Sequence, residues 1–319
     1  MRAICLFTIL AACSTPPAGD DDTTPDAASS DFLPGFTPTA PGADEIQIVS
    51  PIVHDIAPGA DVLMCSYISP DAAFAADTDI THAAGFQSMT GAHHAILYQA
   101  RSKRPVDTHV CTDDDMANAI PLGVTGGEGG EAFQIPDGLA LRAAAHSQLF
   151  FQTHWVNSTD HVIDGQAAFN LRALPVSADR PTASIFSIVS TQFTIPAGKP
   201  GHATTTCSFA KDIQFGTLFG HAHEWGTHVK ITWTPQGAAE DVIYDHDWIP
   251  HDTFAPPALT YAVASPFVVH AGDTVRVDCD YMNTTANDLS FPREMCGAAG
   301  YYFPGNVQLN CVDGSWPGN

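Results

Sequence analysis

Basic residues are scarce in this sequence. Its 319 residues include 12 Lys and Arg against 35 Asp and Glu, so the formal net charge is −23. Such a chain would repel a phosphate backbone, which excludes nucleic acid as an expected partner. Long apolar runs are missing as well, since none reaches the roughly 18 residues that a membrane-spanning helix needs. We therefore expect a globular chain with no membrane-spanning segment.

Helical periodicity is weak outside a short stretch near 113–119. Apolar and polar residues alternate instead, as at 229–234 and 275–281, which is the pattern of strands with one buried face. Similar runs occur at 45–50, 61–69, 94–100, 147–157, 165–174, 185–195 and 241–248. The pattern predicts an all-β fold of two antiparallel, jelly-roll-like β-sandwich domains that face each other across a cleft. A composition break at 175–181 places the domains at 45–178 and 179–319.

The N-terminus has the layout of an export signal. In residues 1–12, Arg2 precedes an apolar stretch, and small residues come before Cys13, which resembles a bacterial lipoprotein signal. An ordinary signal peptide or a wrongly assigned start are the alternatives. Residues 13–44 are rich in Pro, Asp, Ser, Thr, Ala and Gly and are expected to form a disordered tether. We expect either a cell-envelope lipoprotein, attached to the membrane only by a lipid at Cys13 and facing the periplasm or the exterior, or a secreted protein.

Six cysteines remain once Cys5 and Cys13 are set aside with the leader. An even number in an exported chain predicts disulfides. Pairing within each half joins Cys65 to Cys111 and leaves three possible arrangements for the other four. Those four are Cys207, Cys279, Cys296 and Cys311.

Histidine is unusually frequent, with 15 residues that outnumber all Lys and Arg. His221 and His223 are two positions apart, so in a strand they share a face and can bind one metal ion. His93 and His94 are adjacent and would point to opposite faces of a regular strand. The preceding Gly91 makes a bulge or a strand end plausible there, and both side chains could then bind the same ion.

Two further segments carry candidate ligands. His154 shares its strand face with Phe150 and Gln152, and Met295 lies in a Glu-Met-Cys sequence late in the chain. A single histidine near a strand is more often a hydrogen-bonded core or surface residue than a metal ligand. We expect such a structural role for the other ten histidines, of which His228 is the closest rival as a ligand. The ten are His54, His82, His109, His146, His161, His202, His228, His246, His251 and His270.

Taken in order, these features resemble the copper type II, ascorbate-dependent monooxygenases, the family of peptidylglycine α-hydroxylating monooxygenase and dopamine β-monooxygenase. The resemblance covers about residues 45–315. It implies two copper ions per chain, one for electron transfer and one for oxygen activation. The electron-transfer copper would be held by His93, His94 and His154, and the oxygen-activating copper by His221, His223 and Met295. The resemblance also implies the disulfides Cys65–Cys111, Cys279–Cys296 and Cys207–Cys311.

The implied activity is hydroxylation of a C–H bond in a small organic substrate by O2 and a one-electron reductant such as ascorbate. Gln152 matches a Gln beside the third His ligand in the family and is expected to help carry the electron. Imidazole suits copper in both oxidation states and a thioether favours Cu(I), which supports copper over zinc. Zinc at three histidines is the alternative metal, although it explains neither Met295 nor a second site. The alternative function is a non-catalytic extracytoplasmic lipoprotein that binds or stores copper.

The substrate expected from the resemblance differs from that of one relative. In the peptide-hydroxylating enzyme, polar residues near the second copper hold a substrate carboxylate. The matching positions here are Phe219, Gly297 and Ala299, and none of them pairs with a carboxylate. We therefore expect a neutral or aromatic substrate, with Phe219 either beside the copper or packed in the core.

Overall fold

Strands dominate the residues that the computed structural model describes, which are 32–69, 74–88, 90–126, 134–253 and 255–316. The signal segment and Cys13 lie outside these residues, so the predicted lipid attachment remains a prediction. The first half contains β1 (Glu45–Val49), β2 (Val53–Ile56), β3 (Asp61–Tyr67), β4 (Thr78–Gln87), β5 (Ala92–Ala100), β6 (Thr108–Val110), α1 (Asp113–Ala117), β7 (Ala119–Gly126), β8 (Ala140–Ala143), β9 (Leu149–Val156), β10 (Ile163–Gly165) and β11 (Ala167–Pro175).

The second half begins after residue 178 and is also built from strands. It contains β12 (Thr182–Ser190), β13 (Thr194–Ile195), β14 (Pro200–Ser208), β15 (Ile213–Phe215), β16 (Thr217–Ala222), β17 (Gly226–Thr234), β18 (Asp241–Asp247), the short 3-10 helix η2 (Pro250–Thr253), β19 (Leu259–Thr260), β20 (Phe267–Val269), β21 (Thr274–Met282), β22 (Leu289–Ser290), β23 (Cys296–Phe303) and β24 (Leu309–Val312).

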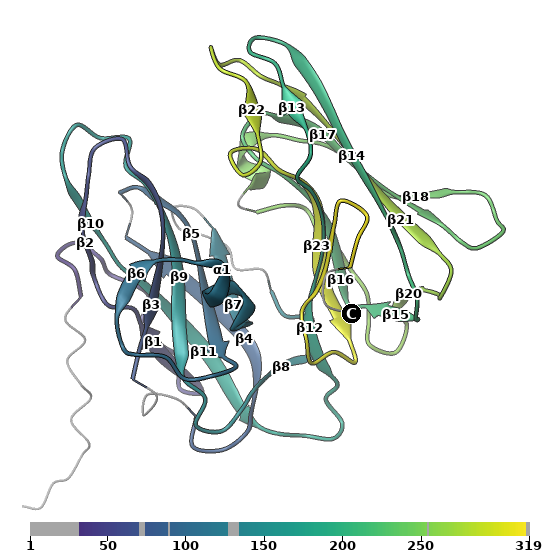
Figure 1. Ribbon diagram of the computed structural model, residues 1–319. Helices are drawn as coiled ribbons and strands as arrows, with labels where there is room; N and C mark the ends of the chain where they lie inside the picture. Colours follow the sequence, from purple (N-terminus) through teal and green to yellow (C-terminus); the bar gives the residue numbers. More distant parts are fainter. Residues whose placement is uncertain (1–31, 70–73, 89, 127–133, 254, 317–319) are drawn as a thin grey trace, which may run out of the picture. The chain divides into compact units, whose positions relative to one another are not determined.

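Three larger sheets organise these strands (Figure 1). One has the order β6-β3-β9-β5-β7, and a second has the order β14-β21-β17-β18. The third follows the order β1-β11-β4-β8-β12-β23-β15-β20, with β16, β19 and β24 joined at its side. The prediction of an all-β, sandwich-type fold is confirmed.

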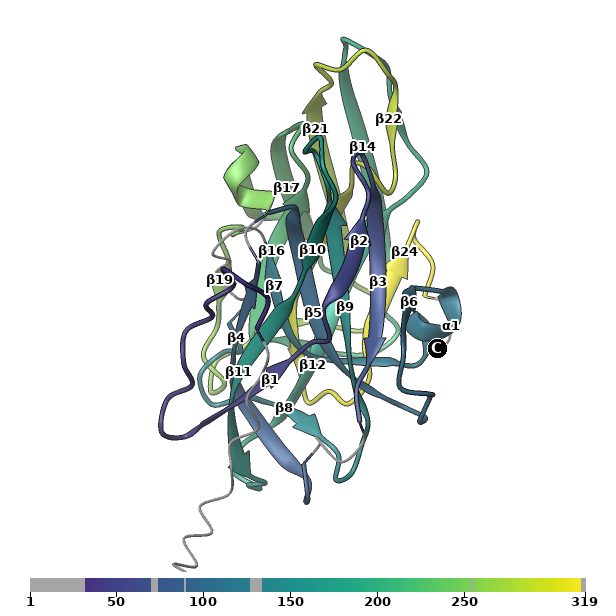
Figure 2. The ribbon, with the colours of Figure 1, turned by 90° about the vertical axis from the view of Figure 1, so that its left-hand side faces the viewer.

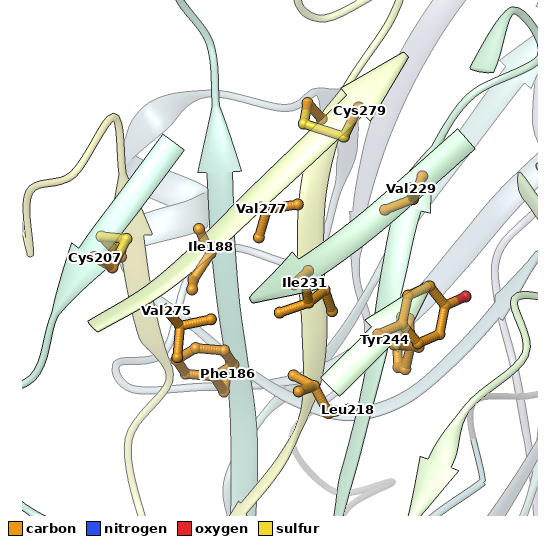
Figure 3. Close-up of a cluster of buried hydrophobic side chains, with 14 of the residues drawn as sticks. Phe186, Ile188, Cys207, Leu218, Val229, Ile231, Tyr244, Val275, Val277 and Cys279 are labelled. Carbon is orange, nitrogen blue, oxygen red and sulfur yellow. A yellow bond between two sulfur atoms is a disulfide. The ribbon is translucent and has the colours of Figure 1, made fainter. Parts of the chain in front are cut away.

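Buried apolar side chains fill the space between these sheets. In the second half, Val229 and Ile231 of β17 pack with Val277 of β21 against Ile188 of β12 and Leu218 of β16 (Figure 3). The predicted alternation is observed throughout 275–281. At 229–234 it holds for Val229 and Ile231, but the pairing with β18 shifts in register after Ile231, and the polar Thr232 is buried while Trp233 is only partly buried. Burial of these apolar side chains is the main force that holds the β14-β21-β17-β18 sheet against the largest sheet.

The expected separation into two domains is not confirmed. The boundary near 178 falls between β11 and β12, yet β8 of the first half pairs in parallel with β12 of the second, through Ala140–Thr182 and Leu141–Ala183. The largest sheet therefore runs across the boundary. The core of the first half also takes in Tyr301 and Phe303 from the second half. Long-range pairing of this kind leaves no trace in local composition.

The local predictions agree with the structure at most positions. The stretch near 113–119 forms α1, in which the Thr112 side chain caps the N-terminus and Asp115 completes a capping box. Figure 2 shows α1 beside β6. The run predicted at 185–195 is interrupted, because β12 ends at Ser190 and the Thr191 N–H donates to the Asp313 carboxylate at 2.7 Å. β4, β14 and β16 were not among the strand runs picked out by alternation alone.

The segment expected to be a tether differs from the expectation at its C-terminal end. Phe36 is only 6% exposed, and the Leu33 N–H donates to Gln166 Oε1 at 2.8 Å. The Thr39 carbonyl accepts hydrogen bonds from Gln47 and Asn170. These contacts attach residues 33–39 to the folded part, because an apolar ring and backbone partners are available there.

Three disulfides bridge Cys65–Cys111, Cys207–Cys311 and Cys279–Cys296. This is the arrangement implied by the family resemblance. Disulfides persist in oxidising compartments, so the three bridges indicate an extracytoplasmic location. Among the described residues, no helix has the length and apolar character required to cross a membrane.

Candidate metal centre

Three histidines of the first half meet at one end of the inner strands β5 and β9 of the β6-β3-β9-β5-β7 sheet. His94 on β5 lies opposite His154 on β9, and the register shifts between Ala92 and His94. Gly91, just before the strand, has a φ of +75°, a conformation that favours glycine. The predicted bulge is therefore present, and it brings His93 and His94 to the same side.

The three rings form a group of metal-ligand type. The ring centroids of His93 and His154 are 4.5 Å apart, and those of His94 and His154 are 5.0 Å apart. One ring nitrogen from each of the three residues lies within 4.8 Å of the other two. The three ligands predicted for the first metal are therefore brought together.

Neighbouring groups orient these rings. The Nε2 of His154 is 2.6 Å from the Asp61 carboxylate, which leaves the other ring nitrogen for a metal. Gln152 hydrogen bonds to the His94 ring, and its own Nε2 lies 2.8 Å from Met116 Sδ. A carboxylate or amide on the far side of a ligating imidazole fixes the ring orientation, as these two do.

Burial favours the neutral form of two of these imidazoles, His93 and His94. It is the largest influence on His93, whose pKa is lowered to about 4, with further lowering by His154 and His223. Burial also lowers the pKa of His94 well below its ordinary value. A neutral imidazole keeps a lone pair for a metal, and imidazole nitrogens are ligands that suit copper or zinc.

The second group lies on β16 and just beyond its end. His221 is within β16, whereas His223 follows the last strand residue, Ala222, so the expectation that both lie inside the strand is corrected by one residue. Their ring centroids are still only 5.1 Å apart. Burial lowers the pKa of His221 to about 3 and also lowers the pKa of His223. Met295, the third predicted ligand, lines the same cavity as these two rings.

Backbone contacts hold His223 in place. Its Nδ1 lies 3.0 Å from the carbonyl oxygen of Arg293, which directs the other ring nitrogen away from that segment. The indole N–H of Trp248 donates to the His223 carbonyl at 3.2 Å. The segment just before Met295 is therefore in contact with His223.

The side chain of Glu294 hydrogen bonds both to the segment that follows β16 and to Met295. Its side chain is fully buried, and Oε1 accepts from the backbone N–H of His223 at 2.5 Å and of Met295 at 2.8 Å. Oε2 accepts from the Trp225 N–H at 3.2 Å. Burial raises the pKa of Glu294 to about 7, and the hydrogen bonds from Met295, His223 and Trp225 oppose that rise.

Sequence reasoning assigned no role to Glu294, although it noted the Glu-Met-Cys motif. The available signal was a carboxylate directly before the predicted sulfur ligand, Met295. Tyr281 adds a further contact, because its hydroxyl donates to the Met295 carbonyl at 2.7 Å. The backbone N–H and the carbonyl of Met295, directly before β23, are therefore both hydrogen bonded.

Both groups of predicted ligands line a single cavity of about 850 Å³. The ring centroids of His93 and His223 are 6.0 Å apart, so the two groups approach each other within it. Gln152 lines the same cavity, as predicted for a residue beside the first group. Every residue of the predicted site is therefore in this one place.

The remaining histidines agree with their expected roles where the structure gives contacts. His228, the rival ligand, lies 2.7 Å from Asp245 and 2.9 Å from Asp247 and does not line the cavity. Carboxylates also accept from six other histidines outside the cavity. These are His54, His109, His161, His202, His246 and His270.

Comparison with known proteins gives no family assignment. No model of a known protein family matches the chain, and no curated protein matches it. Among solved structures, the major capsid protein P2 of bacteriophage PM2 has a TM-score of 0.37 and 7% identity, over 81% of this chain and 97% of that one. The CUB1-EGF-CUB2 domains of rat MASP-1 have a TM-score of 0.18 and 9% identity, over 81% of this chain and 97% of that one. Likenesses this low carry no functional argument.

Proposed function

We propose that this chain is an exported copper-dependent monooxygenase that hydroxylates a C–H bond of a small organic substrate, using O2 and a one-electron reductant such as ascorbate. The observation that carries the proposal is the shared cavity. Both histidine groups line it together with Met295, and burial lowers the pKa of His93 in one group and of His221 in the other. Attachment through a lipid at Cys13 is part of the same proposal.

The donor chemistry fits copper at both groups. His93, His94 and His154 would hold one ion through three nitrogens, and imidazole accepts both Cu(I) and Cu(II). His221 and His223 would hold the other together with Met295, whose soft thioether favours Cu(I) over zinc or magnesium. When bound, copper supplies one-electron and O2 chemistry that no side chain provides by itself.

Side-chain and backbone groups of this chain orient the ligand rings. Asp61 fixes the ring of His154, and the Arg293 carbonyl fixes the ring of His223. Gln152 joins the first ligand group to the cavity wall through its hydrogen bond to His94. We propose that this amide helps to connect the two groups, as the family resemblance implies.

A non-catalytic copper store is the alternative. Storage requires ligands but no space for a substrate beside them. The cavity of about 850 Å³ lies within the range of roughly 300–1,000 Å³ found for small-molecule sites. Its position beside both groups therefore favours the enzyme.

The proposal is tested by copper stoichiometry and oxygen uptake on the purified protein. We expect two copper ions per chain and O2 consumption that requires ascorbate and an organic substrate together. His93→Ala and His221→Ala should each remove one copper and abolish coupled hydroxylation. His228→Ala is the matched control, because this histidine is paired with carboxylates outside the cavity and its loss should leave both coppers in place.

Two results would contradict the proposal. Binding of zinc in preference to Cu(I) at both groups would exclude the redox chemistry. Two bound coppers without any substrate-dependent O2 uptake, across neutral and charged aromatic compounds, would favour the storage function instead.

A further inference from the structure

The cavity walls next to the two ligand groups are apolar. On β5, Ile96 is two residues after His94 and therefore shares its face of the sheet. On β16, Phe219 is two residues before His221 and lies opposite Ala299 of β23. Each ligand group therefore has an apolar side chain next to it on the same strand.

The same surface continues onto neighbouring strands. Val124 of β7 pairs with Ile96 across the sheet, and Ile185 of β12 pairs with Tyr301 of β23. All four line the cavity, together with Tyr98. Burial raises the pKa of both tyrosines, so their phenol groups stay uncharged at neutral pH.

Charge is confined to the exposed part of the lining. Apart from the histidines, the charged residues among the described lining residues are Asp61, Glu224 and Arg293, and all three are exposed. Asp61 is already paired with His154, and the guanidinium of Arg293 lies over the Trp225 ring at 5.3 Å. Apart from the histidines, no buried acid or base among the described lining residues is therefore available to pair with a charged ligand.

We infer that the cavity takes an uncharged, largely apolar organic molecule, large enough to carry more than one ring, against the apolar walls beside the two ligand groups. Burying a charged group without a partner is costly, whereas apolar contact with these walls is favourable. A volume of about 850 Å³ leaves room for such a molecule. The inference rests on the proposed function for the role of this molecule as substrate, but its binding can be measured without copper.

Three naphthalene derivatives with the same ring system test the inference. Naphthylethanol is neutral, naphthylethylamine is a cation and naphthylacetate is an anion at neutral pH, and the fluorescence of the ring reports binding directly. We expect the metal-free protein to bind naphthylethanol at least roughly tenfold more tightly than either charged compound, at high salt so that the net charge of −23 does not attract the amine over long distances. Equal affinity for the three, tighter binding of a charged compound, or no binding of naphthylethanol would overturn the inference.

A charge introduced into the wall provides a second test. Val124→Asp should weaken naphthylethanol binding roughly tenfold and strengthen binding of naphthylethylamine, because the new carboxylate pairs with the ammonium group. Val124→Asn is the matched control, since it is polar without being charged and should give no gain for the amine. Unchanged binding of all three compounds in Val124→Asp would show that they do not occupy this cavity. If Val124→Asp fails to fold, the ranking in the unmodified protein decides the question.

The failure of this inference and the failure of the proposed function give different results. If naphthylethanol binds but is not hydroxylated in the presence of copper, ascorbate and O2, the inference about the cavity stands and the monooxygenase proposal is contradicted for this substrate class. If naphthylacetate is hydroxylated in preference to naphthylethanol, the cavity inference is overturned and the monooxygenase proposal stands.

Discussion

Replacing Glu294 by Gln keeps the shape of the side chain and removes one acceptor from a buried cluster of backbone N–H groups. The carboxylate accepts from His223 and Met295 through Oε1 and from Trp225 through Oε2. If the amide oxygen of Gln takes the first position, its NH2 group faces the Trp225 N–H, and two donors then meet. In the Glu294→Gln protein, the Trp225 N–H should therefore be left without an acceptor.

The magnitude follows from the number of groups left without a partner. One buried donor without an acceptor costs about 1–3 kcal/mol, so we expect the free energy of unfolding of the metal-free protein to fall by that amount. Partners that orient metal ligands typically change metal affinity by roughly 10- to 100-fold. We expect that loss in Cu(I) affinity at the group of His221, His223 and Met295, and no change at the first group.

The assay is competition for Cu(I) with a coloured chelator, together with urea unfolding of the metal-free protein. Glu224→Gln is the matched control, because it removes the same charge one residue after His223 from an exposed side chain. Glu294→Ala should show a larger loss in both measurements, since all three N–H groups lose their acceptor. The reasoning would be refuted if Glu294→Gln and Glu224→Gln had the same unfolding free energy and the same Cu(I) affinity.

The other predictions concern single positions. Met295→Ile should weaken Cu(I) binding only at the group of His221 and His223, and His154→Ala should remove copper only from the first group. Metal analysis that finds the same copper lost in both variants would exclude two separate sites. Cys296→Ser opens a bridge to Cys279 that closes 17 residues, which should cost about 3 kcal/mol in urea unfolding and loosen copper beside Met295; unchanged stability would contradict the estimate. Burial would raise the pKa of Asp115, but hydrogen bonds from neighbouring groups lower it from 3.8 to about 2. Its contribution of about 2 kcal/mol should be present above pH 3.8 and lost as the pH falls through 2, and acid unfolding of Asp115→Asn should lack that dependence.

Local features of the sequence were sufficient to predict several parts of the fold and the site. The strand periodicity at 275–281 depends only on neighbouring residues, and it appears as predicted in β21. Gly91 before a His-His pair predicted the bulge, because a residue with positive φ is a local property of the backbone. The disulfide arrangement followed from the order of ligands and cysteines in the resemblance.

Other features were decided only by contacts between distant residues. His154 lies far from His94 in sequence, and the β5–β9 register places it opposite. The pairing of β8 with β12 carries one sheet across the expected domain boundary, although nothing in either strand indicates a partner. Glu294 can accept hydrogen bonds from His223 and Trp225 only because the tertiary structure places the turn after β16 next to the start of β23. Periodicity fixes which face of a strand is buried, but register and the stacking of sheets depend on the whole core, and these determined which groups meet in the cavity.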